Sequence, residues 1–260
     1  MSPGSFITGA HGSAGSYLLC STPRTGSTLL CGLLESTGVA GHPASYFRRP
    51  DEDAFAAQWA IPRPSDGVSS YADFLEAALS AGTTDNGVFA ARIMWGTLDE
   101  LVERMGTVFP EFAGDDLDLL DHAFARPRFV YLRRRDVLGQ AVSLLRAEQT
   151  DVWHDADDSE PQQLKQDPFY DSERIRSMIR TIEDDNAAWR EWFASVGIRP
   201  YSVAYEDLEA DQERATKGIL EFLELELPPS RTIVGRHKRL RDQLSAEWVE
   251  RYRAEREVVG

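Results

Sequence analysis

The chain lacks the features that place a protein in a membrane or in the extracellular space. Its 260 residues contain no run of about 18 apolar residues, so we expect no transmembrane helix. The N-terminus has no basic segment and too little apolar length for a signal peptide, so we expect residues 1–15 to form a flexible tail and the protein to be cytoplasmic. The only two cysteines, Cys20 and Cys31, are predicted to be buried free thiols rather than a disulfide.

Basic residues are also scarce. The chain has 28 Lys and Arg against 43 Asp and Glu, which gives a formal net charge of −15. Such a charge repels nucleic acid and anionic lipid, so binding of either would need a strong local basic patch, and we expect no nucleic-acid partner. The basic residues that gather at 133–135 and 236–241 therefore stand out against an acidic background. We predict no metal site.

Strand and helix patterns alternate along the chain. Apolar strand patterns begin near residues 17, 87, 128 and 201, and helical patterns cover 71–81, 98–105, 137–150, 171–196, part of 208–225 and the last segment. This alternation favours a single α/β domain over residues 16–260, with a mostly parallel sheet flanked by helices. Ligands on such sheets bind at the carboxyl ends of the strands.

The run from Tyr17 to Gly38 predicts an anion-binding turn. It reads as a short apolar strand, a turn with one glycine and several hydroxyls, and then a helix. The first N–H groups of a helix have no partner within it and the helix dipole adds positive charge, so phosphate binds there readily. Arg24 adds a full charge. A Walker motif, G-x-x-x-x-G-K-S/T, would need lysine where this chain has Ser27, so phosphoryl transfer from ATP is disfavoured.

A second turn repeats this order of strand, turn and helix. The strand that ends at Leu132 runs into R-R-R-D and then into a helix that contains Ser143. Arginines at a helix N-terminus face an unfavourable dipole unless an anion is present, so we expect this turn to bind an anion as well. Asp136 is predicted to cap the helix. Two such turns in one sheet suit a ligand with two separated phosphates.

These motifs resemble those of sulfotransferases that use 3′-phosphoadenosine 5′-phosphosulfate (PAPS), and the chain is most similar to the trehalose 2-sulfotransferase family. P-R-T-G-S-T-L-L resembles the loop that binds the 5′-phosphosulfate, and Y-L-R-R-R-D-V-L-G-Q-A-V-S resembles the motif that binds the 3′-phosphate. The resemblance spans nearly the whole chain. It implies a P-loop-like sulfotransferase fold, PAPS as donor, a hydroxyl of a carbohydrate or glycolipid headgroup as acceptor, and a homodimer.

The resemblance also implies which residues bind the nucleotide. They are Arg24, Thr25, Gly26, Ser27 and Thr28 in the first turn, Arg134 and Ser143 in the second, and Arg239 in the basic run near the C-terminus. Arg24 is in addition a catalytic candidate, because its charge would offset the negative charge that grows on the leaving phosphate.

The chain departs from the family at the general base. The family carries a glutamate in G-E-P-Q-E-F-F, whereas the matching segment here is G-H-P-A-S-Y-F, so Ser45 occupies the position of the base. His42 can accept a proton near neutral pH and is the candidate base, although a loop histidine can equally serve to hydrogen-bond or to contact substrate. Glu35 is a weaker candidate.

Four residues near the expected mouth of the site are candidates for acceptor binding. Arg92 stands where the family has lysine and is predicted to approach the sulfuryl group or the acceptor, unless it holds an acidic neighbour. Tyr46, Phe47 and Trp95 are predicted sugar-stacking surfaces, although aromatic side chains more often belong to the core. The missing glutamate leaves a second hypothesis, a non-catalytic protein that binds PAPS or its desulfated product. A small-molecule kinase is the third, disfavoured by the absent Walker lysine.

Overall fold

A computed structural model describes residues 15–61, 71–153, 165–235 and 243–259. Arg239 and nearly all of the predicted tail, 1–15, lie outside these residues. Within them, none of the helices combines the length and the apolar character needed to cross a lipid bilayer. Cys20 and Cys31 are both buried and free, as predicted.

The core of the fold is a four-stranded parallel sheet. Its strands are β1 (Gly15–Ser21), β2 (Val88–Met94), β3 (Arg128–Arg133) and β4 (Tyr201–Ala204), in the spatial order β2-β1-β3-β4. All three strand pairs are parallel, and Ser21 is in register with Met94 on one side and Leu132 on the other. The α/β prediction is confirmed, and the carboxyl ends of β1, β2 and β3 meet at one edge.

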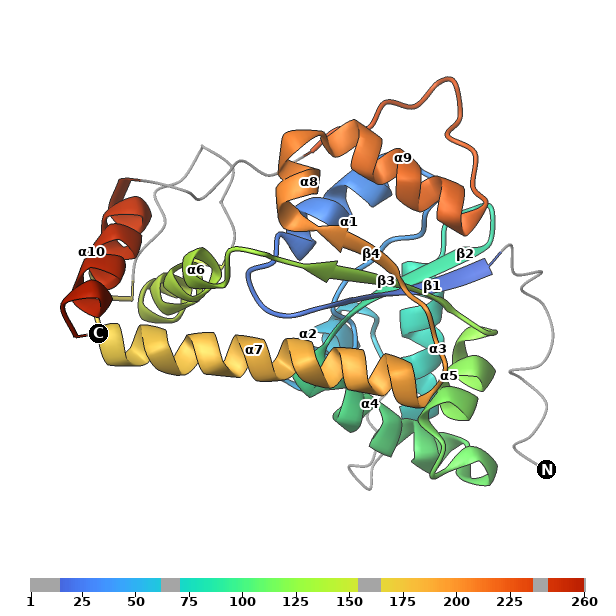
Figure 1. Cartoon of the computed structure of the whole chain (residues 1–260). Helices are drawn as coiled ribbons and strands as arrows, with labels where there is room; N and C mark the ends of the chain where they lie inside the picture. Colours follow the sequence, from blue (N-terminus) through green and yellow to red (C-terminus); the bar gives the residue numbers. More distant parts are fainter. Residues whose placement is uncertain (1–14, 62–70, 154–164, 236–242, 260) are drawn as a thin grey trace, which may run out of the picture.

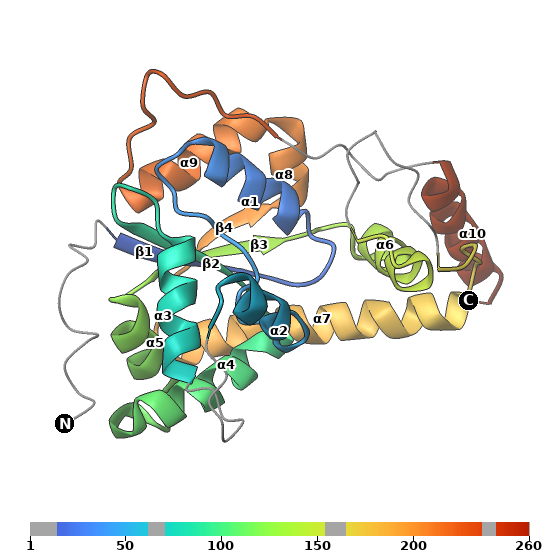
Figure 2. The same cartoon turned by 180° about the vertical axis from the view of Figure 1, so that it is seen from behind.

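Helices cover both faces of the sheet (Figures 1 and 2). On one face lie α1 (Ser27–Ser36), α8 (Tyr205–Ala210) and α9 (Gln212–Leu223). On the other lie α3 (Tyr71–Gly82), α4 (Trp95–Val108), α5 (Asp116–Phe124) and α7 (Ser172–Ser195). Residues 17–21 of β1 are buried because both faces of their strand are covered.

A third apolar cluster lies beside the carboxyl edge of the sheet. It joins α6 (Val137–Thr150), the first half of α7 and α10 (Gln243–Val259), which Figure 1 shows to the left of the strands. On α7, Ile175, Met178 and Ile182 lie in this cluster, and Trp189, Trp192 and Phe193 lie under the sheet.

The single helix expected within 208–225 is two helices, α8 and α9, and three further elements were not predicted from the sequence. They are α2 (Arg49–Gln58), the short 3₁₀ helix η1 (Pro110–Phe112) and α5. Helix α2 starts inside R-R-P because Pro50 stands in its first turn, where a missing N–H costs no hydrogen bond. The α5 segment is short and only weakly patterned, but Asp115 caps it and its apolar residues pack against α4.

Candidate functional site

The first of the two turns predicted to bind an anion joins β1 to α1 and is held from two sides. Within it, Thr25 Oγ1 donates to the carbonyl of Thr22 at 3.0 Å. From α6, buried Gln140 donates through Nε2 to Thr22 Oγ1 at 2.9 Å and to the Pro23 carbonyl at 2.6 Å. Arg24 has a left-handed backbone, with φ of 64°, which a residue with a side chain adopts at a cost. The turn is therefore fixed before any ligand arrives.

Helix α1 begins without a side-chain cap, as do α2, α4 and α8, whereas Asp115, Asp136, Asp171 and Asp211 cap α5, α6, α7 and α9. Its N-cap residue is Gly26, which has no side chain to accept from the first backbone N–H groups. The start of α1 therefore carries no side-chain cap at the turn, which is the arrangement expected of the predicted anion-binding cradle.

Tyr205 explains why a glycine stands at position 26. A Cβ on Gly26 would lie 2.5 Å and 2.8 Å from Cδ2 and Cε2 of the Tyr205 ring, and φ of Gly26 is 82°. Tyr205 begins α8 at the carboxyl end of β4, and the guanidinium carbon of Arg134 lies 4.9 Å from the centre of its ring. Tyr205 therefore links the two predicted anion-binding turns. Sequence reasoning missed it, although its place after the fourth strand was a usable signal.

In the second turn, Arg134 differs in burial from its two neighbouring arginines. Arg133 and Arg135 are exposed, and Arg135 pairs with Asp207. The Arg134 side chain is only 10% exposed, and its Nε is buried with no hydrogen-bond partner among the described residues. Arg134 Nη2 lies 3.6 Å from Asp136, the residue that caps α6 through Gly139 N–H as predicted. Arg134 is thus the arginine of the three that faces the interior.

Contrary to the expectation from the sequence, the three arginines do not need an external anion to offset the helix dipole. Glu206 accepts from the backbone N–H groups of Arg135 and Asp136, each at 3.0 Å. Together with the Asp136 cap and the Asp207 pair, it places carboxylates of the chain itself at the start of α6. The dipole argument alone therefore does not demand a ligand. The unpartnered Nε of Arg134 is the observation that remains in favour of the predicted anion site.

Arg24 connects the two turns. Its Nε donates to Ser143 Oγ on α6 at 3.0 Å, and its Nη1 donates to the carbonyl of Trp153. The residues predicted for the two ends of the nucleotide, Arg24 in the first turn and Ser143 in the second motif, are therefore in direct contact. A single ligand can reach both.

Arg92 on β2 connects the cradle to the loop before α2. Its Nη1 donates to Thr28 Oγ1 at 2.9 Å and to Ser27 Oγ at 3.4 Å, both in the first turn of α1. Its Nε donates to Ser45 Oγ at 2.8 Å. Arg92 thus joins three residues that were predicted separately from the sequence, Ser27, Thr28 and Ser45. Ser45, which occupies the position of the glutamate in the resembling family, therefore lies beside the first turn of α1.

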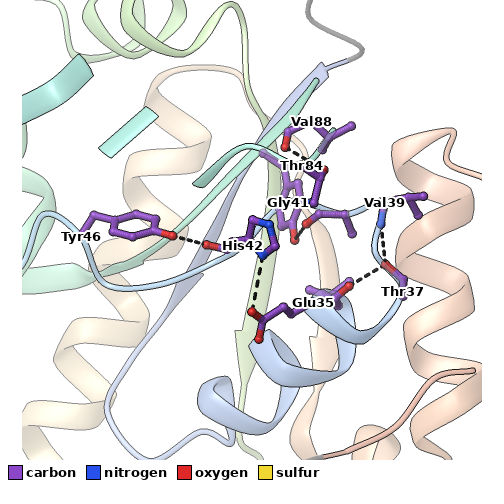
Figure 3. A network of polar contacts seen from close by, with 11 residues as sticks. Glu35, Thr37, Val39, Gly41, His42, Tyr46, Thr84 and Val88 are labelled. Atoms are coloured by element: carbon purple, nitrogen blue, oxygen red, sulfur yellow. Dashed lines mark hydrogen bonds and ion pairs between the residues drawn. The ribbon is translucent and has the colours of Figure 1, made fainter. Parts of the chain in front are cut away.

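His42 lies near the C-terminal end of α1, whereas Arg92 contacts its start. Its Nδ1 is 3.4 Å from Glu35 Oε1 near the end of α1, and its backbone accepts from Tyr46 Oη at 2.6 Å (Figure 3). Glu35 follows Thr28 by seven residues, roughly 10 Å along the helix. The structure pairs the two candidate bases with each other rather than with Arg92. The assignment of His42 as base stays a prediction.

The predicted sugar-stacking residues differ in accessibility. Tyr46 and Phe47 are 5% and 1% exposed in the main core cluster, which favours the core alternative for both. Burial raises the pKa of the Tyr46 phenol, so it stays neutral and serves as a donor. Trp95 is half-buried at the carboxyl end of β2, with its ring centre 5.1 Å from that of Trp189. Trp189 in turn donates to the Ser21 carbonyl at 3.0 Å.

Comparison with known proteins matches nearly the whole chain. The model of the family described as Stf0 sulphotransferase matches residues 16–255. A trehalose 2-sulfotransferase of Mycobacterium tuberculosis is 32% identical, covering 94% of this chain and 96% of the relative. A trehalose 2-sulfotransferase of Mycolicibacterium smegmatis is 30% identical with the same coverage.

Proposed function

This chain belongs to the Stf0 sulphotransferase family, and on that premise we propose that it transfers a sulfuryl group from PAPS to a hydroxyl of a small carbohydrate acceptor. The names of the two relatives support a carbohydrate as acceptor. The observation that carries PAPS as donor is the buried, unpartnered Nε of Arg134 beside the cradle. A donor with a phosphate at each end of a nucleoside would use both turns.

The donor would bind with its 5′-phosphosulfate in the cradle and its 3′-phosphate on Arg134. The cradle offers the N–H groups at the start of α1, the hydroxyls of Ser27 and Thr28, and Arg24. Arg134 offers a guanidinium that can hold phosphate oxygens bidentately. The phosphate competes with Asp136 for Arg134, but their separation of 3.6 Å leaves the existing pair weak.

The reaction forms a bond between the acceptor oxygen and sulfur and breaks the bond between sulfur and the 5′-phosphate oxygen, which keeps the electron pair. Arg24 and the helix N-terminus stabilise the charge that develops on this leaving oxygen. In a loose transition state the bond to the nucleophile is little formed, so a positioned base contributes less and water can take the hydroxyl proton. Ser45, which already accepts from Arg92, orients rather than deprotonates.

A non-catalytic protein that binds PAPS or its desulfated product is the second candidate. It is favoured by one observation, that the residue contacting Arg92 at position 45 is a serine rather than a carboxylate. Such a protein would bind the nucleotide through the same turns and transfer nothing.

The decisive experiment is transfer of labelled sulfate from PAPS to a panel of sugars that includes trehalose, alongside binding of adenosine 3′,5′-bisphosphate. Transfer that Arg24→Ala abolishes supports the proposal. Tight bisphosphate binding with no transfer to any acceptor supports the non-catalytic alternative. Phosphorylation of an acceptor with ATP would overturn both in favour of a kinase.

A further inference from the structure

Asp185 on α7 is a half-buried carboxylate without a partner. Its side chain makes no hydrogen bond or ion pair with any residue that the structure describes. Asp171, at the start of the same helix, accepts by contrast from Arg174 N–H at 2.9 Å. Burial raises the pKa of the Asp185 carboxyl, and the neighbouring Asp184 carboxylate raises it further. A carboxylate partly removed from water is costly unless donors reach it, and the fold provides none here.

Asp185 lies at the carboxyl edge of the sheet, because α7 runs antiparallel to the strands. Phe193 packs against Phe129 near the start of β3, whereas Asn186 Oδ1 accepts from Tyr131 Oη two residues farther along that strand. Figure 1 shows the first half of α7 extending past the strands on the side of α6. Ligands of parallel sheets bind at this edge.

Asp185 and Trp95 are both neighbours of Trp189. Asp185 precedes Trp189 by four residues, so the two side chains are adjacent on one face of α7. Trp95 directly follows β2, and its ring centre is 5.1 Å from that of Trp189. Trp189 Nε1 donates to the carbonyl of Ser21, the last residue of β1 before the cradle. A carboxylate and a half-buried indole are thus gathered next to the cradle.

The end of β2 leaves room for a ligand beside Trp95. A Cβ on Gly96, the next residue, would have no atom of the described residues within 4 Å outside its own stretch of α4. Sugar hydroxyls donate to carboxylate oxygens, and the apolar face of a sugar ring packs on an aromatic ring. Asp185 and Trp95 therefore offer the two kinds of contact that a sugar needs.

The direction of the transfer favours the same side of the cradle. In the proposed function the nucleotide extends from the cradle toward Arg134 and Ser143, on the side of β3 and α6. Attack in line with the leaving oxygen places the acceptor on the opposite side of the sulfur. In the strand order β2-β1-β3-β4 that is the side of β2, where Trp95 lies.

We propose that Trp95 and Asp185 form the acceptor subsite, in which Asp185 holds two adjacent hydroxyls of a neutral sugar ring that packs on Trp95. The proposal rests on the proposed function and narrows its acceptor to a neutral sugar with a vicinal diol. An ionised carboxylate has two oxygens that only accept, so each takes one hydroxyl donor. An acidic sugar is disfavoured, because the carboxylates of Asp184 and Asp185 repel it.

Two substitutions separate this contact from a general effect of charge. Asp185→Asn keeps the shape of the side chain and should weaken binding of a neutral sugar on the order of 10- to 100-fold, the range for lost hydrogen bonds to a charged group. Asp184→Asn is the matched control, because it removes the same charge from an exposed neighbour and should leave the affinity unchanged. Trp95→Ala should weaken binding, whereas Trp95→Phe should retain part of it.

The experiment uses calorimetry on the full chain saturated with adenosine 3′,5′-bisphosphate. The ligands are trehalose, methyl glucoside, its 2-, 3- and 4-deoxy analogues, and methyl glucuronoside. We expect the glucuronoside to bind less tightly than the glucoside, and two analogues that lack adjacent hydroxyls to bind less tightly than the third. In Asp185→Asn the loss caused by each of these two deoxygenations should disappear, because the partner of the hydroxyl is gone.

The subsite would be overturned by equal effects of Asp184→Asn and Asp185→Asn, by deoxygenation losses that persist in Asp185→Asn, or by no binding of any neutral sugar. Tighter binding of the glucuronoside would overturn the choice of a neutral acceptor. Failure of the proposed function gives a different result, since binding needs no turnover. Binding that depends on Asp185 without sulfate transfer would contradict sulfuryl transfer alone, whereas transfer to sugars that Asp185→Asn leaves unchanged would contradict the subsite alone.

Discussion

Gly26→Ala should destabilise the fold strongly, because the cradle is built against the Tyr205 ring. A left-handed backbone costs a residue with a Cβ about 1–2 kcal/mol. The new Cβ would also lie 2.5 Å from a ring carbon of Tyr205, and overpacking of this kind adds about 1–3 kcal/mol. We therefore expect the free energy of unfolding to fall by about 2–5 kcal/mol.

Two comparisons isolate the contribution of the ring. Gly197 has a φ of 70°, but no atom lies within 4 Å of the position that a Cβ would take there, so Gly197→Ala should cost only the backbone share, about 1–2 kcal/mol. With Tyr205→Ala in the background, Gly26→Ala should cost that same amount. The assay is urea unfolding of the four proteins of the Gly26 and Tyr205 double-mutant cycle. Equal losses at Gly26 and Gly197, or no coupling to Tyr205, would refute the reasoning.

Three further changes test other parts of the site. Arg24→Ala should lower kcat more than affinity for PAPS, and steady-state kinetics showing only a raised KM would make Arg24 a binding residue. His42→Gln should keep most of kcat because His42 pairs with Glu35 away from the cradle, and a fall of roughly 10²–10⁴-fold in the rate assay would instead identify it as the base. Trp189→Phe should lower the free energy of unfolding in urea by about 1–3 kcal/mol, because the buried Ser21 carbonyl loses its donor. An unchanged free energy of unfolding would show that this hydrogen bond does not stabilise the fold.

The fold could be predicted from the sequence where the pattern is local. Alternating apolar strands and amphipathic helices indicated the parallel sheet, and the glycine turn after β1 indicated the cradle. Asp136 was predicted as a cap because capping depends on one residue and its nearest neighbours. Helix α2 was missed because its start relies on a proline that usually ends helices.

The site was less predictable because it depends on contacts between distant segments. No local pattern shows that Tyr205 lies against Gly26, or that the Glu206 carboxylate accepts from the start of α6. Nor does any local pattern show which groups contact His42 and Ser45, the two residues considered at the position of the base. In the fold Ser45 contacts Arg92 and His42 contacts Glu35, because the segment between them runs along the edge of β2.

In our proposal the two turns hold the two phosphates of one nucleotide, which can be measured as thermal stabilisation by adenosine 3′,5′-bisphosphate compared with 5′-AMP at matched concentrations. The bisphosphate should stabilise the protein more, because it alone can occupy Arg134 as well as the cradle. Arg134→Gln should remove this advantage, on the order of 1.5–3 kcal/mol, whereas Arg135→Gln should keep it because Arg135 already pairs with Asp207. Equal stabilisation by the two nucleotides in the unaltered protein would contradict the account.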